Sequence, residues 1–398
     1  MDVHNFPAGF LWGASISAHQ TEGNNINSDW WKWEQNKKDS EEFPRDASNE
    51  ACDFYNRYEK DFKIAVDHNL NAIRLSIEWA RIEPTHGTFS NEAITHYQEL
   101  LKNAQSKGLK TFVTLHHFTN PQWFAQKGGW TYWNSPHLFE QYAKLCAEKF
   151  AEYVDSFITL NEPQVFALKS YTDGTWPPNK RNVFLSFISQ VNMMRAHKKA
   201  YRTIKNVCNA PIGISKQMVW YETDPTGSHL WDKATAWIVN FLNDDFYLVP
   251  LVNTLDFIGL NYYFTKRIRN FKDDSPTDYV SDMGWWINPP GLTYLLHKLK
   301  KYNVPLYITE NGLADSTDKY RTQFIRDMLM AVGQAQAEGC DMRGYFHWSL
   351  MDNYEWHEGF WPRFGLVEID RGNDLERIPR PSFDYYSKVC KENRVTVH

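Results

Sequence analysis

The chain has 398 residues, a length that suits one (β/α)8 barrel with loop insertions. Its 43 basic and 48 acidic residues give a net charge of −5 and are mixed along the sequence, which argues against nucleic acid or an anionic membrane as a partner. No apolar run reaches the length of about 18 residues that spans a membrane. Residues 1–5 lack the basic and apolar parts of a signal peptide, so we expect a cytoplasmic protein.

Eight short apolar segments recur along the chain at intervals that leave room for a helix and a loop. We expect strands at 10–17, 72–79, 111–117, 156–162, 211–218, 257–263, 305–310 and 342–350. We expect helices at 52–69, 93–107, 137–152, 184–205 and 322–338, an acidic surface loop at 272–282, and a C-terminal hairpin and helix. This alternation predicts a single-domain (β/α)8 TIM barrel over residues 1–398.

A doubly wound sheet would show a similar alternation of strands and helices. However, no Gly-x-Gly-x-x-Gly or Gly-Lys-Ser/Thr loop follows any of the expected strands. Nucleotide chemistry is therefore disfavoured. Aromatic residues make up 16% of the chain and include 17 tryptophans, which favours a ligand with apolar faces and many hydroxyls, such as a sugar, although core packing also uses such residues.

Two of the expected strands end in a glutamate. Thr159-Leu160-Asn161-Glu162-Pro163 closes the fourth strand, and Tyr307-Ile308-Thr309-Glu310-Asn311-Gly312 closes the seventh. Each acid alone has an ordinary interpretation, as a helix cap or a solvated charge. In a barrel, however, the carboxyl ends of parallel strands meet at one mouth, where reactive groups gather. Two such carboxylates suit glycosidic bond cleavage with retention, which needs a nucleophile and an acid about 5–5.5 Å apart.

Three motifs carry a family resemblance: Thr159 to Pro163, Tyr307 to Gly312, and Trp348-Ser349-Leu350-Met351-Asp352-Asn353-Tyr354-Glu355-Trp356. With them the chain resembles a β-glucosidase of glycoside hydrolase family 1 over nearly its whole length. The resemblance implies a retaining exo-β-glycosidase that acts on terminal nonreducing β-D-glucosyl residues through a covalent glycosyl-enzyme intermediate. It implies that Glu162 is the acid/base and Glu310 the nucleophile. Galactosides and fucosides are alternative substrates.

The same resemblance assigns the remaining site residues. Five match the groups that hydrogen-bond the nonreducing sugar: Gln20, His117, Asn161, Glu355 and Trp356. Asn161 is expected to hold the 2-hydroxyl, Gln20 and His117 the 3-hydroxyl, and Glu355 the 4- and 6-hydroxyls. Trp348 is expected to be the stacking floor.

Three further residues are expected to act on the carboxylates. Tyr263 matches the tyrosine that hydrogen-bonds the nucleophile, and Asn261 supports the site from the same run. Arg74 matches the arginine beside the nucleophile, with a purely structural salt bridge as the other interpretation. No cofactor is expected, and no metal, because His116 and His117 are neighbours on a strand and point to opposite sides.

Two departures from the family pattern concern specificity. Phe118 follows His117 where the family usually has tryptophan, and the region between strands five and six is short, which predicts a more open aglycone side. A 6-phospho-β-glycosidase is disfavoured because Glu355 would repel phosphate. A noncatalytic sugar-binding protein or a thioglucoside-cleaving enzyme typically lacks one of the two glutamates. Transglycosylation to an acceptor alcohol stays open. The expected partner is a small β-glycoside or a short oligosaccharide, and the oligomeric state is not readable.

Overall fold

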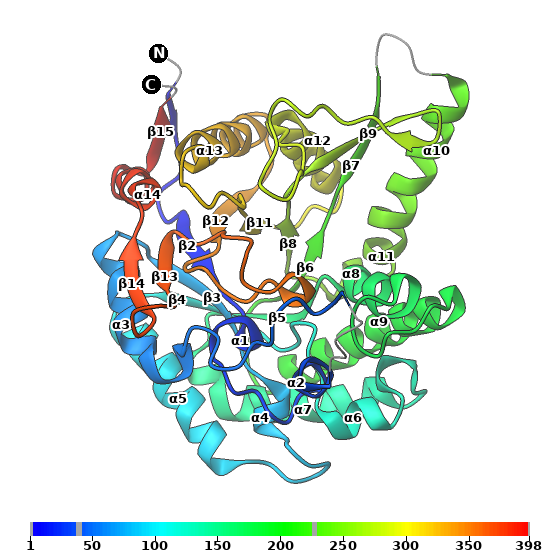
Figure 1. Cartoon of the computed structure of the whole chain (residues 1–398), viewed down its shortest axis with the longest axis vertical. Helices are drawn as coiled ribbons and strands as arrows, with labels where there is room; N and C mark the ends of the chain where they lie inside the picture. The colour runs from blue at the N-terminus through cyan, green and yellow to red at the C-terminus, as the bar shows by residue number, and fades with distance from the viewer. Residues whose placement is uncertain (1–2, 37–41, 225–228, 397–398) are drawn as a thin grey trace.

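Eight parallel strands close into a barrel in chain order. The computed structural model describes residues 3–36, 42–224 and 229–396. The barrel strands are β2 (Leu11–Ser15), β3 (Ala72–Ser76), β4 (Lys110–Thr114), β5 (Ser156–Asn161), β6 (Ile212–Gln217), β8 (Phe257–Asn261), β11 (Leu306–Asn311) and β12 (Met342–Trp348). Pairing of β12 with β2 completes the ring (Figure 1). The predicted (β/α)8 fold is confirmed.

Helices cover the outside of this barrel. Those at the predicted places are α3 (Phe54–Asp67), α5 (Asn91–Ser106), α7 (Ser135–Phe150), α9 (Val183–Lys205), α13 (Arg321–Ala337) and the C-terminal α14 (Pro381–Glu392). Two further helices, α10 (Leu230–Asn240) and α12 (Pro289–Lys300), were not predicted. In α12 the Pro289-Pro290 pair looks like a loop, but proline suits a first helical turn, where its missing N–H would have no helical partner.

Several expected strands end earlier than predicted. β3 stops at Ser76 and the chain enters α4 (Trp79–Ile82), while β4 stops at Thr114, three residues before His117. The apolar sequence continues past the last paired residue because the barrel mouth is covered by short elements that also bury side chains. These are α1 (Ala18–Thr21), α2 (Asp29–Gln35), α6 (Gln122–Gln126), α8 (Pro163–Leu168) and the π-helical turns η3 (Lys169–Asp173) and η4 (Phe241–Asp245). After η4, α11 (Phe246–Leu248) leads toward the start of β8.

The hydrophobic core forms two layers. The inner layer fills the barrel lumen with Ala72, Phe112, Ile158, Phe257 and Phe346. The rings of Phe112 and Phe346 lie 4.9 Å apart. A Cβ atom at Gly13 would come within 2.4 Å of the Phe346 ring, so glycine on β2 leaves the space that this ring fills.

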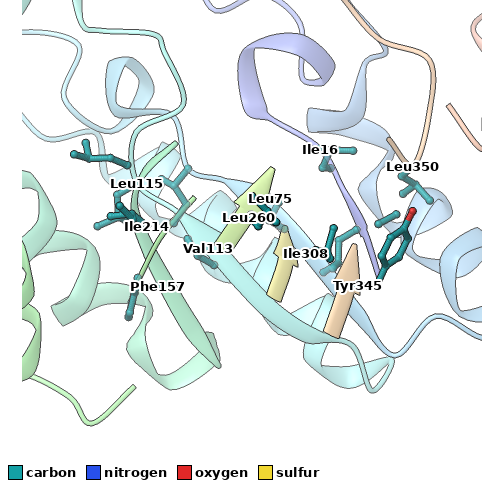
Figure 2. Close-up of a cluster of buried hydrophobic side chains, with 14 of the residues drawn as sticks. Ile16, Leu75, Val113, Leu115, Phe157, Ile214, Leu260, Ile308, Tyr345 and Leu350 are labelled. Atoms are coloured by element: carbon teal, nitrogen blue, oxygen red, sulfur yellow. The ribbon is translucent and has the colours of Figure 1, made fainter. Parts of the chain in front are cut away.

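The outer layer lies between the strands and the helices. Side chains that alternate with the lumen residues point outward, among them Leu75, Val113, Phe157, Ile214, Leu260 and Ile308 (Figure 2). This alternation follows from the period of two in a strand. It is also why the barrel strands read as nearly continuous apolar runs, since both of their faces are buried.

Smaller sheets extend the barrel. β1 (Val3–Asn5) pairs with β15 (Arg394–Thr396), so the first and last strands lie side by side (Figure 1). β7 (Trp220–Thr223), β9 (Thr265–Arg269) and β10 (Lys272–Asp273) form a second sheet. The predicted C-terminal hairpin is β13 (Val367–Asp370) with β14 (Glu376–Pro379). In the part of the chain that the structure describes, no helix is both long and apolar enough to cross a membrane.

Candidate active site

Local shifts of strand pairing bring the two glutamates to the barrel mouth. On β5 the register shifts between Ile158, which packs in the lumen, and Asn161, whose side chain also contacts groups of the lumen. Strict alternation would send the side chains of these two residues to opposite faces. A similar shift on β11 separates Ile308 from Glu310. Bulges of this kind next to active sites redirect side chains, and here both affect a strand that carries a carboxylate.

Glu310 lies between a cation and a phenol. The Arg74 guanidinium, which is fully buried on β3, donates to Glu310 Oε1. Tyr263 Oη donates to Glu310 Oε2 at 2.6 Å. Burial first, and then the negative charge of Glu310, hold the pKa of Tyr263 well above its ordinary value, so this hydroxyl keeps its proton. Both donors stabilise the ionised carboxylate that a nucleophile requires.

Glu162 has the opposite surroundings. It is 5% exposed. Among the described residues, the only hydrogen bond to its side chain is donated by Asn261 Nδ2, 2.6 Å from Glu162 Oε1. Burial raises the pKa of Glu162 to about 8, and the charge of Glu310 adds to this effect. The Asn261 hydrogen bond and the charges of Arg74 and Lys216 oppose the rise only in part. The carboxyl is thus able to hold a proton at neutral pH.

The backbone at Glu162 is held in an uncommon conformation. Its φ of 42° lies in the left-handed region, immediately before Pro163 starts α8. Such a conformation costs a non-glycine residue on the order of 1–3 kcal/mol and persists where the surroundings enforce it, often at functional sites. Phe118 and Trp356, which line the same cavity, also have positive φ, at 71° and 53°.

Asn161 connects the two carboxylates through hydrogen bonds. Its Oδ1 accepts from Arg74 Nη2 at 2.6 Å and from Asn261 Nδ2 at 3.1 Å. Since Arg74 also contacts Glu310 and Asn261 contacts Glu162, a continuous chain of side chains joins the glutamates. The Asn161 Nδ2 lies 3.1 Å from His117 Nε2. Burial, followed by the charge of Arg74, lowers the pKa of His117 well below its ordinary value, so the imidazole is neutral and accepts this bond.

Gln20 and Glu355 form a second polar group at the mouth. The Gln20 amide donates to Tyr354 O at 2.9 Å, to Asn353 Oδ1 at 3.1 Å and, at 3.5 Å, to Glu355 Oε2. Burial raises the pKa of Glu355 to about 8, with further contributions from the charges of Glu310 and Glu358. Glu355 is therefore close enough to Glu310 for the two charges to interact.

The predicted aromatic residues lie next to these polar groups. The His117 ring is nearly parallel to those of Trp348 and Trp356, with interplanar angles of 22° and 18° and centroid distances of 6.0 and 5.9 Å. A cavity of about 1070 Å³ opens here, and its wall includes both glutamates with His117, Tyr263, Trp348, Glu355 and Trp356. The remaining predicted residues, Gln20, Arg74, Asn161 and Asn261, have no exposed surface and stand behind this wall. All eleven are thus brought to one site.

Other contributors were not predicted. The Thr309 hydroxyl donates to Asn261 Oδ1 at 2.6 Å, which turns the Asn261 amide so that its nitrogen faces Glu162. Lys216 on β6 is 1% exposed, and its charge acts on Glu162. A lysine inside an apolar strand was the signal that could have revealed it. The segment 272–282, expected to be plain surface, supplies Asp273, Ser275, Pro276 and Thr277 to the cavity wall. Among the described residues, no group of three or more His, Cys, Asp or Glu side chains is arranged to hold a metal.

Comparison with known proteins decides the family. The sequence profile of glycosyl hydrolase family 1 matches residues 3–252 and 229–395. The chain belongs to glycosyl hydrolase family 1. As a member of this family it is a glycoside hydrolase of the β-glycosidase type.

Individual family 1 relatives agree in sequence and in fold. Beta-glucosidase A of Thermotoga maritima is 31% identical over 451 aligned positions, covering 99% of each chain. The galactolipid galactosyltransferase SFR2 of Arabidopsis thaliana is 32% identical and covers 86% of this chain and 58% of its own. The solved β-glycosidase from Pyrococcus horikoshii superposes with a TM-score of 0.92 at 34% identity, covering 99% of this chain and 97% of its own.

Proposed function

We propose that this family 1 glycosidase hydrolyses terminal nonreducing β-D-glucosyl residues with retention, with Glu310 as nucleophile and Glu162 as acid/base. The observation that carries the proposal is the contrast between two neighbouring buried carboxylates. Glu310 contacts a guanidinium and a phenol, whereas Glu162 has a single amide donor and a pKa of about 8. Environments that differ in this way assign base and acid roles to a pair of carboxylates.

In the first half-reaction Glu310 attacks the anomeric carbon while Glu162 protonates the leaving oxygen. The bond from the sugar to its aglycone breaks as the bond to Glu310 forms, and the proton of Glu162 leaves with the aglycone alcohol. Tyr263 then loses its charged acceptor, because Glu310 is now an ester. Its hydroxyl is 2.6 Å from Glu310 Oε2 in the free enzyme.

In the second half-reaction Glu162 acts as a base. Esterification of Glu310 removes the negative charge that contributes to the raised pKa of Glu162, so this carboxyl can ionise. The ionised form takes a proton from water as the water attacks the anomeric carbon, and Glu310 is released. A single residue thereby serves both steps.

Sugar recognition is proposed to follow the predicted roles. Asn161 binds the 2-hydroxyl, Gln20 and His117 the 3-hydroxyl, and Glu355 the 4- and 6-hydroxyls, with Trp348 as the floor. Asn161 hydrogen-bonds His117, and Gln20 hydrogen-bonds Glu355. The His117 ring also stacks on Trp348, so these side chains are held in place before the sugar binds. Glu355 disfavours a phosphorylated sugar, because Glu310 and Glu358 add negative charge beside it. We also propose that residues 1–398 work as a single domain.

Transfer of the sugar to an acceptor alcohol is the second candidate reaction. It shares the intermediate on Glu310 and is favoured by the likeness to a relative named as a galactosyltransferase. Added alcohol distinguishes the two, because a transglycosidase forms a new β-glycoside faster than it releases free sugar.

Proton NMR of an aryl β-glucoside digest tests the proposal. We expect β-glucose to be the first anomer released and the Glu310→Gln variant to be inactive. Release of α-glucose first would contradict retention. If the wild-type protein releases no sugar from glucoside, galactoside and fucoside alike, the proposed hydrolytic function is wrong and a noncatalytic sugar-binding role becomes the better hypothesis.

A further inference from the structure

Five aliphatic side chains line the active-site cavity beside polar lining residues of the same part of the chain, namely Gln164, Lys169, Thr172, Ser186, Gln190 and Asn243. Val165 and Leu168 come from α8, Val183 from the start of α9, and Val239 and Leu242 from α10 and η4. We call these five residues the aliphatic wall. The helices that carry them lie on one side of the barrel (Figure 1). They are joined where Gln164 Nε2 donates to Asn243 O at 3.3 Å, and α8 packs against α9.

The aliphatic wall begins beside the proposed acid. Glu162 is the residue directly before α8, and Val165 follows it within one helical turn. The groups proposed to bind the nonreducing sugar come from other elements, with Gln20 at the end of α1 and Glu355 after β12. Because Glu162 protonates the leaving oxygen, the aglycone has to project toward its side of the cavity. The aliphatic wall therefore lines the path of the aglycone.

Three members of the wall are exposed in the free protein. Leu168, Val183 and Leu242 have 46%, 71% and 54% of their surface exposed. The lining residues Phe264, Met283 and Trp285 are half-buried and belong to a separate cluster with Tyr263, Trp348 and Phe364. The cavity lining thus contains an aliphatic group and a mainly aromatic group of side chains. Aliphatic side chains offer neither the flat ring nor the hydrogen bonds that bind an aglycone sugar, but they suit a flexible hydrocarbon.

The same helices carry further exposed apolar side chains outside the cavity lining. Phe184 and Phe187 of α9 are 68% and 49% exposed, and Trp237 and Phe241 beside the wall are 69% and 45% exposed. Several large exposed apolar side chains on one part of a protein mark a binding site more often than isolated ones do. Trp237 and Phe241 line a second cavity, with Trp220 and Tyr294, whereas the aliphatic wall lines the cavity that the substrate must enter, which favours the substrate itself as the occupant of the wall.

We infer that the preferred substrates are amphiphilic β-glycosides whose aglycone is a hydrocarbon chain, with the aliphatic wall as the chain-binding site. This inference rests on the proposed function, because it needs the aglycone to leave past Glu162. Affinity for the transition state then rises with chain length, since each methylene that reaches the wall leaves water.

Hydrolysis of butyl and octyl β-D-glucosides, each below its micelle-forming concentration, tests the inference. The octyl chain has four more methylenes than the butyl chain. If each partly buried methylene gives about a twofold gain, kcat/KM should be at least about tenfold higher for the octyl glucoside. The Leu168→Asn/Leu242→Asn variant should reduce this octyl-to-butyl ratio to below about threefold. The matched control Ile378→Asn replaces a side chain that is 42% exposed on β14, outside the cavity lining, and should keep the wild-type ratio.

Three results would overturn the inference. The first is an octyl-to-butyl ratio near one in the wild-type protein, and the second is a high ratio that survives in the double variant. The third is a wild-type dimer, seen by sedimentation, that the double variant converts to monomer, because the surface would then bind a second copy. Quenching of tryptophan fluorescence by butyl and octyl β-thioglucosides gives a readout without turnover. If octyl binds at least tenfold tighter while no glucoside is hydrolysed, the chain-binding site stands and only the proposed function falls.

Discussion

Asn261 Nδ2 lies 2.6 Å from the Glu162 carboxylate, and it is the one side-chain donor recorded for that oxygen in the described structure. The contact favours the ionised form of Glu162 and so limits how far burial raises its pKa. Asn261 thereby tunes the proposed acid/base without touching the reacting bond. Its own orientation depends on Thr309, the residue before Glu310.

Replacing Asn261 should move the alkaline limit of activity. Because glycosylation needs protonated Glu162, kcat/KM should fall as the pH rises through the pKa of about 8. In Asn261→Ala the lost hydrogen bond raises that pKa further, by about one unit, so the fall should come at higher pH. The pH profile of kcat/KM checks this. Thr309→Val, which removes only the orienting hydroxyl, should shift the limit less, and an unchanged limit in Asn261→Ala would remove Glu162 from the acid role.

Tyr263 and its neighbour Tyr262 form a matched pair of tests. Tyr263→Phe removes a hydrogen bond to a carboxylate, which is worth about 1.5–3 kcal/mol, so kcat/KM should fall roughly 10- to 150-fold. Tyr262 donates to Asn288 O at 2.6 Å and lies outside the cavity lining, so Tyr262→Phe should lower the melting temperature with little effect on kcat/KM. Equal kinetic losses in the two variants would show that the Tyr263 contact is structural.

Azide should rescue each glutamate variant with a different product. Glu310→Gly should lose on the order of 10⁴-fold in turnover, as expected when a nucleophile is removed. Azide should then yield the α-glycosyl azide by attacking the face that Glu310 occupied. Glu162→Ala should still be glycosylated by an activated aryl glycoside, whose leaving group needs no proton, and should give the β-azide. NMR of the products assigns the roles, and exchanged products would reverse them.

The raised pKa of Glu162 should also make the fold less stable at alkaline pH. Its folded value of about 8 exceeds the ordinary value of 4.5, so the folded state holds the proton more tightly. The stabilisation is fully present below pH 4.5 and is lost as the pH rises to about 8, by an amount on the order of a few kcal/mol. Glu162→Gln avoids this loss. Its gain in melting temperature over wild type should therefore be larger at pH 9 than at pH 5.

An exposed glutamate serves as the control for that experiment. Glu148 has 45% of its side chain exposed on α7, and its carboxylate pairs with Lys144 at 3.6 Å. Glu148→Gln should change the melting temperature by less than about 1 °C at either pH, because exposed ion pairs contribute little. If Glu162→Gln raises the melting temperature equally at pH 5 and pH 9, ionisation of the Glu162 carboxyl does not destabilise the folded protein.

The barrel and the two strand-end glutamates were predictable because they depend on local patterns, whereas the other site residues were expected only from the family resemblance. Apolar runs buried on two faces, each followed by a polar turn, predict parallel strands, and the residues after Thr159 and Tyr307 stand at strand ends by sequence alone. Helix α12 was missed because Pro289-Pro290 resembles a loop. The part of 272–282 that lines the cavity was missed because its polar composition is that of any surface segment.

The electrostatic design of the site could not be read from the sequence. The register shifts on β5 and β11 depend on the pairing of neighbouring strands, which residues 158–161 and 308–311 do not encode by themselves. The hydrogen bonds from Asn161 to two different donors depend on the closed barrel. Burial of Glu162, the largest cause of its raised pKa, comes from elements far apart in sequence.

The aromatic filling of the lumen has a consequence for the order of events during turnover. Phe112, Phe257 and Phe346 fill the barrel lumen below the site, so molecules enter and leave the cavity from the barrel mouth. In the proposed function the sugar sits deepest and the aglycone lies between it and solvent. The aglycone must therefore depart before water can reach the glycosyl-enzyme, and a slowly leaving aglycone would set the pace of the whole cycle. Release order, rather than bond cleavage, then decides how the enzyme partitions its intermediate between water and another alcohol.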